Sequence, residues 1–252
     1  YSGMEHQSAV TYGNRFANGY LERDWTGVGV STRFDFIIIH ESAHEWFGNA
    51  VTAADVADEW IHEGWGTYLE AVYVEDQFGY ADALKYINGY QSKVRNREPV
   101  VTEPGINRTP SQDMYFKGAL FLHTLRSVVG NDTAWWALIR DFYQEFKYRN
   151  ISTDDVVAFF NRKTRQDLSP IFDQYLRRAA LPTLDLQFQE GGQVAYRWST
   201  DVKGFAMPIK VGRPDHWQVL RPTTAWQVLT TTIPKDEFEV ATELYYINVS
   251  RQ

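Results

Sequence analysis

The 252-residue sequence contains no cysteine, no long apolar run and no cluster of basic residues. Without cysteine, the chain forms no disulfide, no thiolate zinc site and no cysteine nucleophile. The apolar run at residues 36–39 is far too short to cross a bilayer. Acidic residues outnumber basic ones by 32 to 25, giving a formal net charge of −7. This balance argues against nucleic acid or an anionic membrane as the main partner.

Apolar and aromatic residues are plentiful. The hydrophobic fraction of 44% and the charged fraction of 23% are typical of a soluble globular protein and exclude disorder and coiled coil. Nine tryptophans and an aromatic fraction of 15% predict a densely packed core or a cleft lined by aromatic rings. The length suits one large domain, or a medium domain with a small one.

Helical patterns dominate the first 180 residues. Gly48, Gly79 and Gly130 are typical stop signals, and Ser152 with Asp155 has the layout of a capping box. A long loop is expected over 97–113, which contains three prolines. The patterns predict helices over residues 36–47, 63–78, 81–96, 115–129, 133–148, 152–164 and 169–180.

After Pro182 the apolar residues alternate with polar ones, which is typical of strands. A short strand is also expected at residues 9–12. The C-terminal strands are expected at 184–188, 194–198, 205–211, 225–231 and 243–249. We therefore predict an α+β fold, with a mainly helical domain over 1–180 and a small β-sandwich over 181–252.

His40, Glu41 and His44 form an H-E-x-x-H pattern. Histidines four residues apart lie one turn apart on one side of a helix, so both imidazoles can reach one metal ion. Glu41 is placed to hold a water rather than the metal. Zinc in a hydrolase takes three protein ligands, and Glu63 is the candidate for the third. The alternative to a metal site is that both histidines make only ordinary hydrogen bonds within the fold.

Four segments together resemble the M1 aminopeptidases. Residues 40–49, HESAHEWFGN, closely match the zinc helix of that family, HExxHxWFGN. Residues 60–70, WIHEGWGTYLE, are similar to its W-L-N-E-G-F-A segment. Residues 3–7, GMEHQ, resemble its G-x-M-E-N exopeptidase motif, and residues 114–118, MYFKG, its Y-x-K-G motif. The resemblance implies a thermolysin-like zinc catalytic domain followed by a β-sandwich.

The resemblance also implies roles for the metal and its neighbours. His40, His44 and Glu63 would hold one zinc ion, which lowers the pKa of a bound water to about 7. Glu41 would act as the general base on that zinc-bound water. The Tyr115 hydroxyl would stabilise the oxyanion of the tetrahedral intermediate.

Gly3, Met4 and Glu5 would bind the substrate. The resemblance assigns Glu5 to the free α-amino group, which a carboxylate would hold by a charge-assisted hydrogen bond. That contact would place the first peptide bond over the metal. We therefore expect a zinc-dependent aminopeptidase that hydrolyses the N-terminal peptide bond of peptides.

Several nearby residues have open roles. Glu70 and Asp58 could each support a zinc-binding histidine from behind, and a structural role is equally compatible with the sequence. Lys117 is expected to brace the turn at Tyr115 rather than touch substrate. His62 is not expected to be a fourth ligand.

Three residues depart from the family motifs. His6 replaces an asparagine, which could alter how the amino end of the substrate is held. Trp65 replaces a phenylalanine, which could shrink or reshape the pocket for the first side chain, so the substrate preference of the family does not carry over. Gly66 replaces an alanine.

M1 members carry a β-rich domain before the G-x-M-E-N motif, whereas this chain begins two residues before it. We therefore expect a C-terminal portion of a longer polypeptide, with that upstream domain as its partner. The sequence shows no counterpart of the large C-terminal helical domain of many members, so we expect a short bacterial-type form. The compartment stays unknown from the sequence, with a periplasmic or secreted location slightly favoured over a cytoplasmic one. The sequence leaves open a zinc endopeptidase, an epoxide-lipid hydrolase, and an inactive fragment that binds only zinc and peptide.

Overall fold

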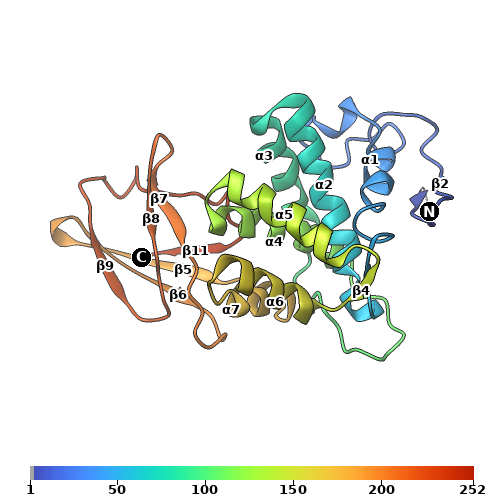
Figure 1. Ribbon diagram of the computed structural model, residues 1–252. Coiled ribbons are helices and arrows are strands. Elements are labelled where there is room, and N and C mark those ends of the chain that lie inside the picture. Colours follow the sequence, from blue (N-terminus) through green and yellow to red (C-terminus); the bar gives the residue numbers. More distant parts are fainter. Residues whose placement is uncertain (1–2) are drawn as a thin grey trace.

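The computed structural model describes residues 3–252, so Tyr1 and Ser2 of the predicted first domain lie outside it. The helices fill one half of the molecule and the strands from β5 onward fill the other (Figure 1). The helices in chain order are α1 (Phe36–Ala43), α2 (Trp60–Phe78), α3 (Tyr80–Gly89), α4 (Asp113–Val129), α5 (Asp132–Phe146), α6 (Thr153–Thr164) and α7 (Ser169–Leu176).

Two short strand pairs belong to the helical half. β1 (Gly3–Met4) pairs antiparallel with β2 (Thr11–Tyr12). β3 (Val51–Ala53) pairs parallel with β4 (Arg149–Ile151). The second pair joins segments far apart in the sequence, and neither of its strands has a period-two pattern long enough to predict it.

The C-terminal strands form two sheets. In the first, of order β11-β5-β6-β9, β11 is parallel to β5 and the other pairs are antiparallel. The second has the order β10-β7-β8. The bounds are β5 (Thr183–Gln189), β6 (Gln193–Ser199), β7 (Ile209–Arg213), β8 (His216–Leu220), β9 (Gln227–Thr230), β10 (Glu239–Val240) and β11 (Asn248–Arg251). The predicted mixed fold is confirmed, whereas the sandwich and the boundary at residue 180 stay predictions.

Three predicted helices end early. α3 stops at Gly89 instead of residue 96 and is followed by a 3-10 turn over Tyr90–Lys93. α1 stops at Ala43 instead of residue 47, because the following residues form turns in which Asn49 donates to the carbonyl of His44 at 2.8 Å. These turns bring the chain back to the start of β3. α7 stops at Leu176 instead of residue 180, and the carbonyls of Arg178 and Ala179 accept hydrogen bonds from Lys117.

Helix α2 lies at the centre of the helical half and packs against α1, α3 and α4. Its contact with α4 is closest at Gly64 and Gly118. A Cβ added to Gly64 would lie only 3.1 Å from the Cα of Gly118, so the two backbones touch at this crossing. Side chains at either position would separate the helices.

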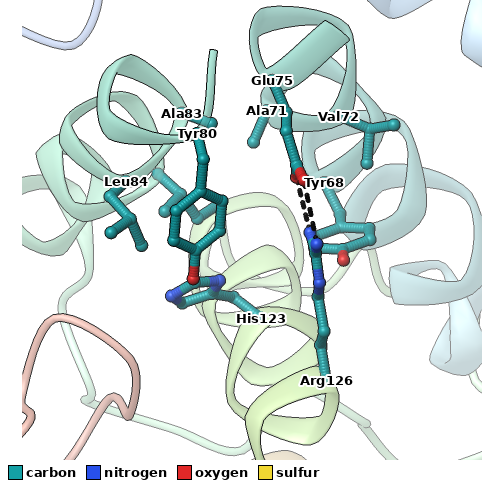
Figure 2. A pocket seen from close by; sticks show the side chains of 10 residues that line it. Tyr68, Ala71, Val72, Glu75, Tyr80, Ala83, Leu84, His123 and Arg126 are labelled. Atoms are coloured by element: carbon teal, nitrogen blue, oxygen red, sulfur yellow. Dashed lines mark hydrogen bonds and ion pairs between the residues drawn. The ribbon is translucent and has the colours of Figure 1, made fainter. Parts of the chain in front are cut away.

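A cluster of polar residues ties α2, α4 and α5 together behind this crossing. Figure 2 shows Arg126 facing Glu75, which it binds through two hydrogen bonds of 2.6 and 2.9 Å. Arg126 also donates to Asp132 at 2.9 Å, and His123 on the same helix donates to the carbonyl of Glu243 at 2.8 Å. The cavity here measures about 10 Å³, which holds at most one water.

The described part of the chain has no helix that is both long and apolar enough for a membrane span.

Candidate metal centre and active site

Helices α1 and α2 bring the three predicted zinc ligands together. Asp35 caps α1 by accepting from the backbone of Ile38, and the histidines lie at its end. The Nε2 atoms of His40 and His44 are 3.1 Å apart, and each lies 3.3 Å from Oε2 of Glu63. A tetrahedral zinc with bonds of about 2.0–2.1 Å separates its ligand atoms by ~3.3 Å. The spacing therefore fits a zinc ion.

The hydrogen bonds of the two imidazoles support the same reading. Nδ1 of His44 lies 2.9 Å from the carbonyl of Phe47, which can only accept, so this nitrogen carries the proton. Nδ1 of His40 lies 2.7 Å from Oε1 of Glu70 and donates to it in the same way. With both Nδ1 atoms used as donors, the two Nε2 atoms face one point beside Oε2 of Glu63, where zinc would take the place of a proton.

The charges around this point also favour a cation. Burial opposes protonation of His40, but hydrogen bonds with Glu63 and Glu70 outweigh it and hold the pKa of this imidazole well above its usual value. Burial raises the pKa of the Glu63 carboxyl, yet its hydrogen bonds with His40 and His44 lower that pKa far below the usual range. Glu63 is therefore an anion at neutral pH.

The open roles of Glu70 and Asp58 differ in the structure. Glu70 lies behind His40 and is 1% exposed. Asp58 instead accepts from the backbone and hydroxyl of Thr153, at 3.2 and 2.6 Å, and so holds the start of α6. Glu70 therefore contacts a predicted zinc ligand, His40, whereas Asp58 contacts Thr153 and none of the predicted ligands.

Glu41 points into the space beside the ligands. It is 5% exposed, and its Oε2 has no hydrogen-bond partner among the described residues. Burial raises the pKa of this carboxyl, and the imidazoles of His40 and His44 lower it by a smaller amount. Strand β1 covers Glu41, because a Cβ at Gly3 would collide with its carboxylate. A free, desolvated carboxylate at this place can accept a proton from water.

Tyr115, near the start of α4, donates its hydroxyl to Oε1 of Glu63 at 2.7 Å. Burial and the charge of Glu63 hold the pKa of the Tyr115 hydroxyl far above its usual value. The hydroxyl therefore stays protonated and remains a hydrogen-bond donor at neutral pH.

Glu5 reaches the same site from β1. Oxygen and nitrogen atoms of Glu5, Glu41 and His44 all lie within 4.8 Å of one another. Asn49 donates to the backbone carbonyl of Glu5 at 3.0 Å and so fixes this strand to the end of the zinc helix. Sequence reasoning did not assign a role to Asn49, although it is part of the matching H-E-x-x-H segment. Met4 is 40% exposed and does not line the cavity.

A cavity of about 250 Å³ opens beside His40 and Glu41. Aromatic rings form much of its wall, as the composition predicted. Its lining includes Gly3, Tyr20, Trp25, Phe36, Ile37, Thr67, Glu70, Tyr90, Gln112, Tyr115 and Phe116.

Comparison with known proteins decides the family. Residues 1–175 match the Peptidase family M1 domain, which is more than half of the chain. The chain belongs to peptidase family M1. The resemblance drawn from its motifs is therefore confirmed.

Several M1 relatives are aminopeptidases by name. Aminopeptidase B of Homo sapiens is 30% identical over 168 residues, which cover 58% of this chain and 26% of that protein. Mitochondrial aminopeptidase 2 of Saccharomyces cerevisiae is 24% identical over 208 residues, or 77% of this chain and 21% of that protein. The chain thus spans about a quarter of the length of these relatives.

Two solved structures share the fold. Aminopeptidase A of Legionella pneumophila, solved with aspartic acid, matches all of this chain over 31% of its own, with a TM-score of 0.77 and 14% identity. An M1 zinc metallopeptidase of Deinococcus radiodurans, an E323A mutant bound to Tyr-Ser-Ala, matches 72% of this chain over 38% of its own. Its TM-score is 0.56 at 23% identity.

The three residues that depart from the M1 motifs differ in burial and in their neighbours. Trp65 does not line the cavity: its ring is fully buried and stacked on Phe47 and Phe142, with ring centroids 4.5 and 5.6 Å away. Gly66 lies beside the zinc ligands, since a Cβ there would be 3.0 Å from Cε1 of His44. His6 is exposed.

Proposed function

We propose that this chain is the zinc-binding part of an aminopeptidase that hydrolyses the N-terminal peptide bond of peptides. The observation that supports it best is the convergence of three zinc-ligand atoms beside two further carboxylates. The carboxylates of Glu41 and Glu5 each have an oxygen within 4.8 Å of a ring nitrogen of His44. One carboxylate is placed for proton transfer and the other for an ammonium group.

His40, His44 and Glu63 would hold one zinc ion, which when bound polarises the scissile carbonyl and lowers the pKa of water. Glu41 would accept the proton of the attacking water and pass it to the leaving amine. Tyr115 would donate its hydroxyl hydrogen bond to the oxyanion that develops on the substrate.

Glu5 would give the site its exopeptidase character. A carboxylate beside the general base can bind a free α-amino group, which leaves the first peptide bond next to Glu41. An acetylated N-terminus is uncharged, so it would make no ion pair with Glu5 and would bind poorly. Residues 1–180 would form the catalytic unit and residues 181–252 a β-sandwich, because regular helices end with α7 and strands resume at β5.

Hydrolysis of aminoacyl p-nitroanilides, free and N-acetylated, tests this proposal in the zinc-loaded chain. We expect cleavage of the free series only, and a reduced preference for free amines in Glu5→Ala, with Glu190→Ala as an exposed control. Equal cleavage of both series would instead favour an endopeptidase. No cleavage by a chain that holds one zinc would favour a site that only binds zinc and peptide.

A further inference from the structure

A second acidic side chain faces Glu5 from helix α2. Glu59 precedes the first residue of this helix and lies one turn before Glu63. Ligand atoms of Glu5, Glu59 and His62 all lie within 4.8 Å of one another. This group shares Glu5 with the one formed by Glu5, Glu41 and His44, so Glu5 lies near both Glu59 and the general base.

Helix capping does not explain the Glu59 side chain. It makes no hydrogen bond to the backbone of the first turn of α2, although it occupies the N-cap position. The side chain is only 25% exposed. Its charge also contributes, with that of Glu5, to the raised pKa of Tyr115, whose first cause is burial. Glu59 therefore lies close enough to the active site for its charge to act on Tyr115 and Glu5.

His62 orients Glu59. Nε2 of His62 accepts a hydrogen bond of 2.7 Å from the backbone N–H of Ala53 in β3. The proton of the neutral ring must then lie on Nδ1, which is 3.3 Å from Oε1 of Glu59. The same hydrogen bond excludes His62 as a metal ligand. If Nδ1 bound a metal, the ring proton would have to lie on Nε2, where it would clash with the N–H of Ala53.

Two carboxylates this close repel each other unless a cation lies between them. An ammonium that donates hydrogen bonds of about 2.8 Å to one oxygen of each carboxylate separates those oxygens by ~4.6 Å. The oxygens of Glu5 and Glu59 lie within 4.8 Å of each other, so one ammonium can reach both carboxylates. Glu41, whose buried Oε2 has no hydrogen-bond partner among the described residues, also lies within 4.8 Å of Glu5, so the peptide bond of a substrate held at Glu5 would lie near the general base.

We propose that Glu59 binds the α-amino group of the substrate jointly with Glu5, and that His62 is the positioning residue that holds Glu59 toward it. The inference rests on the proposed aminopeptidase function. It adds a specificity-determining residue from the helix that bears the third zinc ligand. The substrate it selects is a peptide with a free, protonated N-terminus.

Calorimetry with two hydroxamates tests this in the zinc-loaded chain. Phenylalanine hydroxamate and 3-phenylpropanohydroxamate differ only in the α-amino group, and their hydroxamate groups bind zinc alike. We expect Glu59→Gln to weaken binding of the amine probe about tenfold or more, the loss for one charge-assisted hydrogen bond. Binding of the desamino probe should change less than about twofold. Glu190→Gln, at an exposed turn, removes the same charge elsewhere and should change neither.

His62→Asn should produce a smaller loss that is again specific to the amine probe. Unchanged amine selectivity in Glu59→Gln, together with lost selectivity in Glu5→Gln, would overturn this inference alone and leave the proposed function standing. A wild-type chain that binds both probes equally would overturn both. Equal weakening of both probes in Glu59→Gln, or a second zinc ion lost in that variant, would also contradict an ammonium site.

Discussion

His40 and Glu70 form a buried pair in which Nδ1 of the imidazole lies 2.7 Å from Oε1 of the carboxylate. The other oxygen of Glu70 accepts hydrogen bonds from the hydroxyls of Tyr86, at 2.6 Å, and of Tyr90. Burial, followed by the charge of Glu70, raises the pKa of both hydroxyls, so they remain donors. Glu70 is thereby fixed as an acceptor for His40, which leaves the opposite nitrogen free for zinc.

Glu70→Gln should raise the Kd for zinc about 10- to 100-fold, because the glutamine cannot accept the imidazole N–H as a carboxylate does. Competition with a chromogenic chelator measures this. Asp58→Asn is the matched control, since Asp58 is also a buried acid but bonds Thr153 instead. We expect that control to lower stability and leave the zinc affinity unchanged. Equal zinc affinities in Glu70→Gln and wild type would remove Glu70 from the metal centre.

Tyr115→Phe should reduce kcat about 10²- to 10³-fold with little change in KM, the cost of one lost oxyanion donor. Zinc should stay bound, because Tyr115 contacts Oε1 of Glu63 while Oε2 faces the two histidines. Steady-state kinetics and a zinc assay on the same preparation distinguish the two effects. Wild-type kcat in the variant, or lost zinc, would argue against the oxyanion role.

Gly118→Ala should destabilise the fold by ~1–3 kcal/mol, because the new methyl group would force α2 away from α4. The added Cβ would lie 3.0 Å from the Cα of Gly64. Urea denaturation measures the change in the free energy of unfolding. Arg140→Ala, on the exposed face of α5, is the control and should change stability little. A Gly118→Ala chain as stable as wild type would show that the helices can separate freely.

Acid should destabilise the helical half partly through His123. Burial lowers the pKa of this imidazole below its ordinary value of 6.5. The unfolded chain therefore binds a proton that the folded chain resists, and stability is lost as the pH falls below about 6.5. His123→Gln, which can still donate to the carbonyl of Glu243, should flatten the dependence of unfolding free energy on pH in this range. Identical slopes in variant and wild type would exclude this contribution.

Local patterns in the sequence were enough to predict most helices and the convergence of His40, His44 and Glu63; that they bind zinc stays a prediction. The capping box at Ser152 and the hairpin of β5 and β6 are confirmed, since both depend on neighbouring residues alone. His40, His44 and Glu63 converge because a helix repeat and one short connection bring them together.

What the sequence could not predict depends on contacts between distant segments. β3 and β4 pair across about a hundred residues, and their short, mixed patterns give no local signal. Glu70 and Asp58 could not be told apart from the sequence, because the difference lies in their contacts. Glu70 accepts from the His40 imidazole, whereas Asp58 accepts from Thr153. The position of Trp65 in its motif likewise does not tell which side of α2 faces the core, where the structure places its ring.

The most direct test of the account compares kcat of the zinc-loaded wild-type chain with that of Glu41→Gln on an aminoacyl p-nitroanilide. The account predicts one bound zinc in both chains and a loss of several orders of magnitude in kcat, because the amide cannot accept the proton of the attacking water. The aminoacyl bond should remain intact over the assay with the variant. Comparable turnover by Glu41→Gln, with zinc in place, would contradict the role of Glu41 and the mechanism built on it.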